Sequence, residues 1–154
     1  MAGCGKVDFS SLQSFVNKVE SELGSEEKVQ EFIDACAKEL ATRLLTKVIR
    51  RTPVGEYPDR VGGTLRRGWT GEKQQDVQTY VNTLNIVHSG ENVTIEIINP
   101  VEYASYVEYG HRTRNHKGWV EGKFMLTISV QEIQQAAPGV LENKLKRKLG
   151  EVFG

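Results

Sequence analysis

The sequence predicts an α+β fold, in which helices precede and follow a small antiparallel hairpin. Apolar residues recur at three- and four-residue steps in the first third of the chain and again near its end, which predicts helices at both ends. Val93, Ile95 and Ile97 alternate with polar residues directly after the turn sequence SGEN, which predicts a hairpin strand. At 154 residues the chain fits a single domain.

The first third of the chain predicts two helices. The apolar spacing over residues 9–23 indicates a short amphipathic helix that ends at Gly24. Ser25 suits the N-cap of a second helix, because two glutamates follow it where the helix dipole favours negative charge. The second apolar stripe runs almost to Pro53, which predicts a helix of roughly 27 residues, about 40 Å long. We expect another chain to cover part of so long a stripe.

The middle of the chain predicts a loop and then strands. Residues 52–63 contain two prolines and three glycines, so they are expected to form a loop. Residues 77–88 are rich in Val, Thr, Tyr and Ile, and we interpret them as the first arm of the hairpin, with a bulge or bend near Tyr80. A further strand around residues 67–72 is expected to extend this sheet.

The stretch NPVEYASYVEYG, residues 99–110, predicts a helix of about ten residues. Residues suited to a helix start and a glycine stop bound it: Asn99, Pro100, Glu102 and Gly110. Helical spacing places Tyr103, Tyr106 and Val107 on one face and Glu108 nearly opposite. A polar loop, 111–118, follows. Helical sequence resumes near Gly122, and Pro138–Gly139 is expected to break it before a basic C-terminal helix, 139–154.

The charges balance overall but are segregated along the chain. With 20 basic and 20 acidic residues the formal net charge is zero, so no global field attracts DNA or a membrane. Residues 1–42 carry a net charge of −4 and residues 43–67 a net charge of +5, which suits surfaces that meet complementary surfaces. Two unlike cysteines, no membrane-length apolar run and no signal peptide predict a protein that stays in the cytoplasm.

The sequence contains no convincing catalytic or metal-binding pattern. His111 and His116, with Glu102 or Glu108, could in principle bind zinc, but the spacing is not that of a helical HExxH site. Ser105 and the cysteines lack a nucleophile context, and no glycine-rich phosphate loop is present. We therefore expect no catalytic residue, no metal and no cofactor.

Basic residues beside aromatic ones leave nucleic-acid binding open as an alternative function. They form two groups, the first being Arg50, Arg51, Arg60, Arg66 and Arg67, and the second Arg112, Arg114, Lys117 and Lys123 beside Trp119. Such groups can hold phosphates and stack bases. The neutral total charge and the acidic first third argue against general DNA affinity, which favours charges at the rims of protein contacts.

The octet YASYVEYG, residues 103–110, resembles a signature of the tail-completion, or head–tail joining, proteins of tailed bacteriophages, a family that includes minor tail protein Z-like members. GGTLRRGW, residues 62–69, and KGWVEGKFMLTISVQE, residues 117–132, resemble family elements in the same order. The resemblance covers roughly residues 25–137. Two departures are a basic loop, HRTRNHKGW, longer than the family's short turn, and Gly-Lys-Phe-Met at 122–125 where the family often has Ala-Arg-Pro-Phe-Leu.

The resemblance implies an α+β fold with a small antiparallel sheet flanked by helices, one of them long. It also implies a single domain, 1–154, with an N-terminal helical segment, 1–24, a family-like core, 25–137, and the C-terminal helix. The implied function is that of a virion subunit that forms a homo-oligomeric ring, expected to be sixfold, at the head-proximal end of the tail. Its partners would be copies of itself, tail terminator, tube or sheath proteins and neck or connector proteins, with DNA passing through and no membrane.

Candidate interface residues follow from this hypothesis. The packing anchors are expected to be aromatic, because aromatic residues are enriched at interface hot spots: Tyr103, Tyr106, Tyr109, Trp119 and Phe124. The tyrosines could also simply cover the sheet. Glu108 is expected to pair with an arginine and so fix the loop after Gly110. Its candidate partners, with a further basic residue of that loop, are Arg66, Arg67, Arg112 and Arg114.

Overall fold

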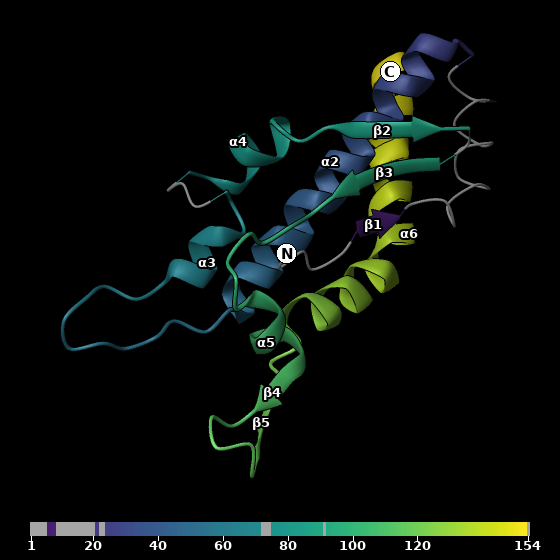
Figure 1. The fold of residues 1–154 in the computed structure, drawn as a ribbon. Coiled ribbons are helices and arrows are strands. Elements are labelled where there is room, and N and C mark those ends of the chain that lie inside the picture. Colours follow the sequence, from purple (N-terminus) through teal and green to yellow (C-terminus); the bar gives the residue numbers. More distant parts are fainter. Residues whose placement is uncertain (1–5, 9–20, 22–23, 72–74, 91, 154) are drawn as a thin grey trace.

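A computed structural model describes residues 6–8, 21, 24–71, 75–90 and 92–153. The predicted helix over residues 9–23 lies outside the described residues. The described elements, in chain order, are β1 (Lys6–Asp8), α2 (Glu26–Arg51), α3 (Thr64–Gly68), α4 (Val77–Asn82), β2 (Ile86–Ser89), β3 (Asn92–Glu96), α5 (Ala104–Tyr109), β4 (Gly110–Arg112), β5 (Trp119–Glu121) and α6 (Met125–Phe153). The predicted α+β class is confirmed (Figure 1).

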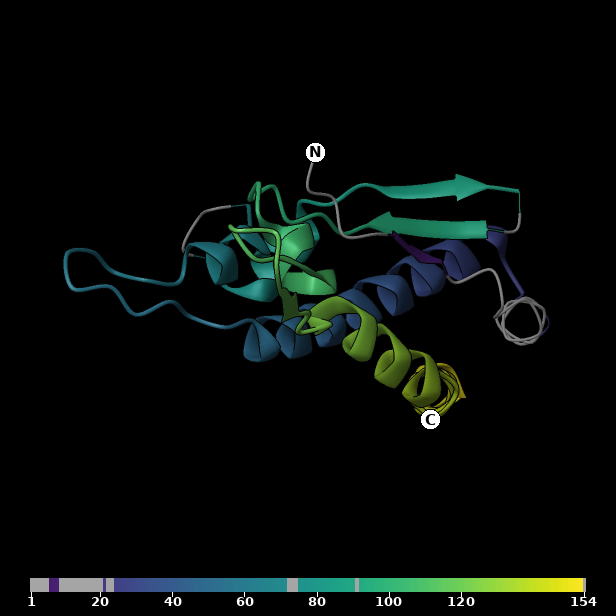
Figure 2. The same cartoon turned by 60° about the horizontal axis from the view of Figure 1, so that its bottom comes forward.

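The long helix α2 lies between a sheet and α6, as Figure 2 shows. The sheet has the order β1-β3-β2 and is antiparallel throughout, so β3 is its central strand. Ile95 of β3 lies opposite Val7 on one side and Ile86 on the other. Along β3 the buried Val93 and Ile95 alternate with less buried polar residues, as expected for a strand with one face on the core.

Helix α2 begins as predicted, because the Ser25 hydroxyl accepts a hydrogen bond from the Lys28 amide at 3.3 Å. It spans 26 residues and ends before Thr52. We expected another chain to cover part of its apolar stripe, but the chain itself covers most of that stripe. Its buried residues run from the first turn to the last: Val29, Phe32, Cys36, Ala37, Leu40, Ala41, Leu44, Leu45 and Val48. The covering elements are α6, α4 and β3 of the same chain.

Two of the predicted strand assignments are wrong. Residues 77–82 form helix α4, because the Asp76 carboxylate accepts from the amides of Gln78 and Thr79 and so starts a helix there. Only Ile86–Ser89 of the expected arm pairs with β3. Residues 64–68 form α3 and not the start of a strand, and the third strand of the sheet is β1. At residues 77–82 the local cap by Asp76 outweighs the strand propensity of Val, Thr and Tyr.

The predicted break at Pro138–Gly139 is also wrong, because α6 continues through both residues as one helix of 29 residues. Proline removes one backbone hydrogen bond and bends a helix without always ending it. Figure 2 shows α6 changing direction in its middle. Ala137 and Leu141, on either side of the proline, are buried, and this packing holds the helix together. None of the described helices combines the length and the apolar character needed to span a membrane.

Candidate interface at the α5–α6 junction

Glu108 is buried at the end of α5 and caps the N-terminus of α6. One of its carboxylate oxygens, Oε1, accepts from the backbone amides of Leu126 at 2.8 Å and Thr127 at 2.9 Å, and Oε2 accepts from Leu126 at 3.0 Å. Its side chain is 0% exposed. The first amides of a helix lack partners within the helix and carry partial positive charge, so a carboxylate there is stabilising. Glu108 therefore fixes the position of α6 relative to α5.

The backbone before α6 caps α5 in return. The amides of Lys123 and Phe124 donate to the carbonyls of Val107 at 2.8 Å and Glu108 at 3.0 Å. Phe124 adopts a φ of 48°, which is unusual for a residue other than glycine. Gly110 has a φ of 88°, and a Cβ there would lie 2.6 Å from the Val120 carbonyl oxygen. The glycine that was predicted to stop the helix is thus required by both its backbone angle and its surroundings.

The expected arginine partner of Glu108 is not observed, because backbone amides occupy both carboxylate oxygens. Arg66 instead donates to the carbonyl of Thr52 at 2.7 and 3.2 Å, at the C-terminal end of α2. Arg67 donates to the carbonyl of Gly62 at 3.2 Å. Arg112 and Arg114 lie exposed at the far end of the molecule and form no ion pair with a described residue.

Asn99 does not cap a helix at residue 100, and the helix is shorter than predicted. The Asn99 side chain is fully buried, accepts from the Val101 amide at 3.1 Å and donates to the Leu65 carbonyl of α3 at 2.8 Å. A Cβ on Gly68 would collide with the Asn99 amide group and lie 2.8 Å from Val101. Asn99 is therefore used to join α3 to the segment before α5, and α5 begins only at Ala104. Glu102 is exposed.

The predicted aromatic anchors surround the junction and are all solvent-exposed in the single chain. Their exposed fractions lie between 39% and 59%: Tyr103, Tyr106, Tyr109, Trp119 and Phe124. The rings of Tyr109 and Phe124 contact each other edge to face with centroids 6.5 Å apart. Tyr106 lies 5.8 Å from the His111 ring. That these residues anchor contacts between subunits stays a prediction.

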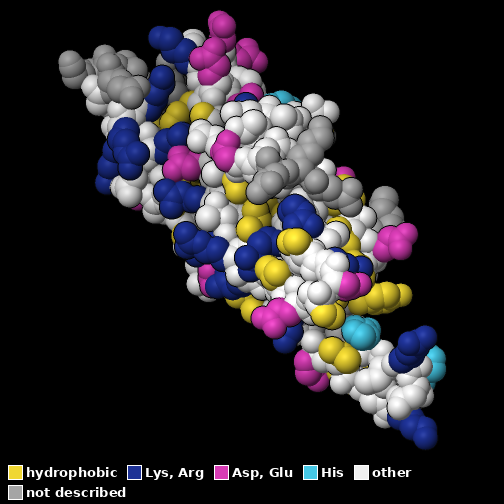
Figure 3. Space-filling view, turned by 90° about the vertical axis from the view of Figure 1, so that its left-hand side faces the viewer, with side chains coloured by type: hydrophobic (Ala, Val, Ile, Leu, Met, Phe, Trp, Pro, Cys, Tyr) yellow, Lys and Arg dark blue, Asp and Glu magenta, His cyan; other side chains and the backbone are white. Residues whose placement is uncertain are grey.

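A short hairpin of β4 and β5, residues 110–121, projects beyond the junction (Figure 1). Of the predicted polar loop 111–118, the first two residues belong to β4 and the others connect the two strands. Thr113 and Asn115 hold this turn: the Thr113 hydroxyl donates to Asn115 Oδ1 at 2.7 Å and accepts from the Gly118 amide at 3.0 Å. Figure 3 shows exposed hydrophobic side chains next to the body and Lys, Arg and His side chains at the projecting tip. The hairpin is therefore apolar at its base and basic at its end.

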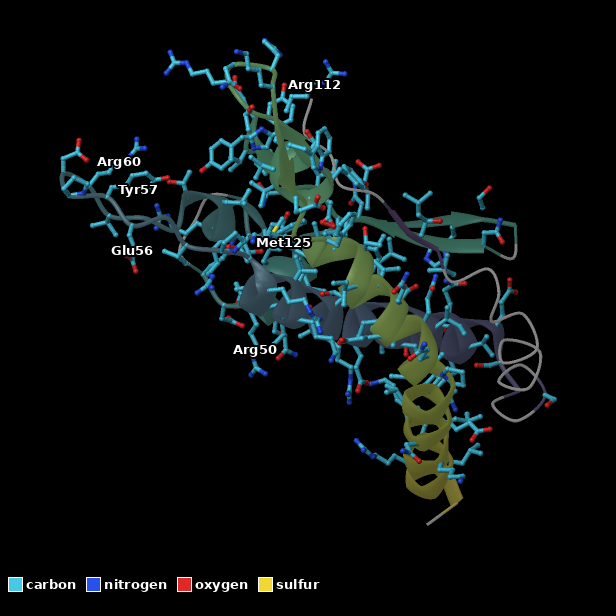
Figure 4. All side chains as sticks on the ribbon, turned by 90° about the horizontal axis from the view of Figure 1, so that it is seen from below. Arg50, Glu56, Tyr57, Arg60, Arg112 and Met125 are labelled. Carbon is cyan, nitrogen blue, oxygen red and sulfur yellow. The ribbon has the colours of Figure 1, made fainter. Side chains whose placement is uncertain are left out.

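A second projection is formed by residues 53–63, which we call the arm. All of its residues up to Val61 are exposed, including the apolar Val54, Tyr57 and Val61. The Arg60 guanidinium lies 4.1 Å from the centre of the Tyr57 ring. Figure 4 shows Glu56, Tyr57 and Arg60 on the arm, which points away from the body in a different direction from the Arg112 hairpin.

A cleft of about 380 Å³ lies between the root of the arm and α5. Val54, Tyr57 and Val61 line it on the arm side, and Tyr103 and Val107 line it on the α5 side. Its walls are thus partly apolar and partly polar, and three of its apolar residues are ones that the arm leaves exposed. The cleft is partly open to solvent.

No group of three or more His, Cys, Asp or Glu side chains within the described part of the chain is placed to hold a metal ion. His111 lies in β4 and its Nδ1 is 2.8 Å from the Arg112 carbonyl oxygen, while His116 lies in the hairpin turn. Cys36 is buried in α2, and burial raises the pKa of its thiol to about 12. A thiol with so high a pKa is a poor nucleophile.

Sequence reasoning missed two features of this end of the molecule. Residues 52–63 are predicted to form a loop, but proline and glycine content does not indicate that residues 53–63 extend outwards as an arm. The capping role of Glu108 was missed because its partner amides come from residues 126 and 127, about eighteen positions later. A signal was present in both cases, namely apolar residues inside a loop and an acidic residue on the face opposite the tyrosines.

A family model, described as "Bacteriophage HK97-gp10, putative tail-component", matches residues 13–110, more than half of the chain. The match includes α2, α3, the sheet strands β2 and β3, and α5 to its closing glycine. No curated protein and no solved structure matched the chain. The chain therefore belongs to the HK97-gp10-like family of bacteriophage tail components.

Proposed function

We propose that the chain is the repeating subunit of a homo-oligomeric ring, sixfold by expectation, at the head-proximal end of a phage tail. In this role it joins the tail terminator, tube or sheath to the neck or connector while DNA passes through the centre. Membership of a tail-component family supports a place in the virion, and the tail-completion signature at residues 103–110 supports the position near the head.

The observation that carries the proposal is a group of exposed aromatic side chains on the hydrogen-bonded α5–α6 junction. Tyr106, Tyr109 and Trp119 are each more than half exposed, and they surround a junction that Glu108 and the α5 carbonyls hold in place. Large exposed apolar groups mark interaction sites in soluble proteins. Aromatic side chains on a rigid support lose little conformational entropy when they are buried, which suits them as interface anchors.

The charge pattern supports a contact between unlike surfaces. A ring forms when one patch of a subunit meets a different patch of the next subunit and the rotation closes. The basic region 43–67 and the acidic region 1–42 remain candidates for such partners, although most of residues 1–23 lie outside the described part of the chain. Within the body several charges are already paired, including Lys144 with Glu39 and Lys47 with Glu132.

The test is the mass of the purified full chain in solution together with its shape. We expect light scattering and native mass spectrometry to give a concentration-dependent equilibrium towards one closed oligomer, and negative-stain images to show rings. In a phage that carries a null allele of this gene, we expect filled heads and free tails that wild-type protein joins when added to the lysate. A chain that stays monomeric at high concentration, with normal particles in its absence, would contradict the proposal.

The alternative function, nucleic-acid binding, is favoured by one observation. Arg112, Arg114 and Lys117 are exposed on the hairpin that also carries Trp119, so basic and stacking groups lie together. Fluorescence anisotropy with a single-stranded oligonucleotide at several salt concentrations tests this function. If the protein contacts phosphates, the logarithm of the binding constant should fall steeply with the logarithm of the salt concentration. If the hairpin binds nucleic acid, Arg112→Gln with Arg114→Gln should reduce that slope by about two. Wild-type protein without measurable affinity at low salt would exclude this function.

A further inference from the structure

We propose that the subunits of the ring join by insertion of the β4–β5 hairpin, residues 110–121, into the cleft between the arm and α5 of the next copy. This inference rests on the proposed function. Trp119 fills the cleft, and the basic hairpin tip meets the acids of the arm. The occupant of the cleft is thus a second copy of this chain. The contact is heterologous, since the hairpin and the cleft are different surfaces.

The apolar parts of the two surfaces match. Trp119 and Val120 are 55% and 43% exposed, and both lie on β5, the strand that returns from the hairpin tip to the body. The cleft presents apolar side chains at both walls, Val54 and Tyr57 from the arm and Val107 from α5. Insertion removes all of these groups from water. Tryptophan in a desolvated pocket is a common hot spot of protein interfaces.

The charges of the two surfaces are complementary. The hairpin carries Arg112, Arg114 and Lys117 against one acid, Glu121. The arm carries Glu56 and Asp59 against one base, Arg60, which already lies over Tyr57. Neither Glu56 nor Asp59 has an ion-pair partner among the residues that the structure describes, and the three basic residues of the hairpin have none either. Complementary charges on two surfaces steer their association and fix the register in which they bind.

The geometry makes this contact one between chains. The hairpin and the arm leave the body in different directions, as both Figure 1 and Figure 4 show, so a chain does not fill its own cleft. In an open row of subunits, the hairpin at one end stays unbound and the cleft at the other end stays unoccupied. Closing the row into a ring fills both, so the contact itself favours a closed oligomer.

Cysteine cross-linking tests which surfaces meet. In a background with Cys4→Ser and Cys36→Ala, one protein carries Asp59→Cys on the arm and a second carries Arg114→Cys at the hairpin tip. Mixing the two under mild oxidation should give a covalent heterodimer at least tenfold more abundant than either homodimer. The matched control replaces Arg114→Cys by Lys146→Cys, an exposed position on the C-terminal half of α6. Equal yields for the hairpin and control mixtures, or homodimers in excess, would overturn the inference.

Charge reversal tests the same contact without a cross-link. Glu56→Lys with Asp59→Lys, and separately Arg112→Glu with Arg114→Glu, should each raise the concentration needed for half assembly roughly tenfold or more. The chain with all four changes should recover assembly. Lys146→Glu with Arg147→Glu, an equal change in charge at exposed positions on α6, should assemble as the wild type does.

The outcomes separate this inference from the ring itself. If the wild type forms rings and the reversed variants form them equally well, the hairpin contact is wrong and the ring stands. If the wild type forms no oligomer, the proposed function fails first. Circular dichroism of each reversed variant shows whether it is folded. A variant that loses assembly while folded, and regains it in the fourfold chain, supports the contact.

Discussion

The body of this molecule and its projecting end differ in how far their apolar side chains are buried and their charges are paired. In the body, where α2 packs against α6 and the sheet, most of the large apolar side chains are buried and several charges are paired, with Glu39 bound to Lys144 and Glu132 bound to Lys47 and Arg51. At the end that carries the arm and the β4–β5 hairpin, aromatic rings face water and the charges of both projections lack ion-pair partners among the described residues.

If the chain assembles as proposed, folding and assembly should depend on different residues. The body contains what is needed to hold the fold, because buried area and satisfied polar groups supply the stability of a domain. The projecting end contributes little burial within the chain, so its side chains are free to contact other molecules. Changes in the body should therefore act on the unfolding free energy, and changes in the projections on association. The predictions below are ordered by their expected effect on the unfolding free energy of the single chain.

The largest loss of unfolding free energy is expected from Trp69→Ala. Trp69 is fully buried beneath α3, and its indole donates to the Thr52 hydroxyl at 2.8 Å. Removing a buried tryptophan leaves a cavity and costs about 3–5 kcal/mol. Urea unfolding followed by circular dichroism measures it, with Trp119→Ala as the matched control, since Trp119 is 55% exposed. Similar losses for both variants would show that the two ends are not distinct.

Glu108→Ala should cost about 2–3 kcal/mol, because it leaves the buried amides at the start of α6 without an acceptor. Glu108→Gln should cost less, since its amide oxygen can still accept from Leu126 or Thr127. Urea titrations of both variants measure the difference. The exposed Glu142, on the same helix, is the control and should change the free energy by less than about 0.5 kcal/mol when replaced by alanine. Equal stability of Glu108→Ala and wild type would remove the capping role.

Local rules predicted the elements whose signals lie close together in the chain. Ser25, two glutamates and an apolar stripe predicted α2 to within a residue or two, because capping and periodicity act over one or two turns. The alternation at Val93 and Ile95 predicted β3 for the same reason. Both signals depend on immediate neighbours, so no knowledge of the tertiary structure was needed.

The cap of α4 at Asp76 is local and was overlooked, whereas other wrong predictions concern residues whose partners are distant in sequence. Asn99 was predicted as a helix cap from its neighbours, but Leu65 of α3 holds its side chain. Pro138 was predicted to end a helix, but burial of Leu141 and Leu145 against α2 keeps α6 continuous. Charge alone predicted an arginine partner for Glu108, but the backbone amides at the start of α6 donate to its carboxylate. In the candidate site, the sequence identified the exposed tyrosines but not the direction in which the arm and hairpin project.

A smaller, pH-dependent loss is expected from Lys144→Met, which removes the ion pair between α6 and α2. The hydrogen bond from Lys144, 2.8 Å long, lowers the pKa of Glu39 below its ordinary value of 4.5. Because the folded pKa is lowered, this contribution is present above the unfolded pKa and is lost as the pH falls through the folded pKa. The variant should be about 0.5–1 kcal/mol less stable at pH 7 and should approach the wild type as the pH falls below 4.5 and through the folded pKa of Glu39.

Urea titrations at several pH values measure this difference, and Lys146→Met is the control because Lys146 is exposed on the same helix. The control should match the wild type within error at each pH. A deficit of Lys144→Met that stayed constant down to pH 3 would mean that lost packing, and not the ion pair, causes it.

The smallest effect on the single chain is expected from Tyr106→Ala, together with the largest effect on assembly. Tyr106 is 59% exposed and its ring lies against the His111 ring, so its loss should change the unfolding free energy by less than about 0.5 kcal/mol. If the aromatic group anchors a neighbouring subunit, the concentration for half assembly should rise about tenfold or more, since truncation of a hot-spot residue costs about 2 kcal/mol or more and a tenfold change corresponds to about 1.4 kcal/mol. Val87→Ala, at an equally exposed apolar residue of β2, is the control and should leave assembly unchanged. Parallel losses for Tyr106→Ala and Val87→Ala would mean that exposed apolar area anywhere drives association. A loss confined to Tyr106→Ala would place the interface at the α5–α6 junction, where the fold leaves its aromatic rings uncovered.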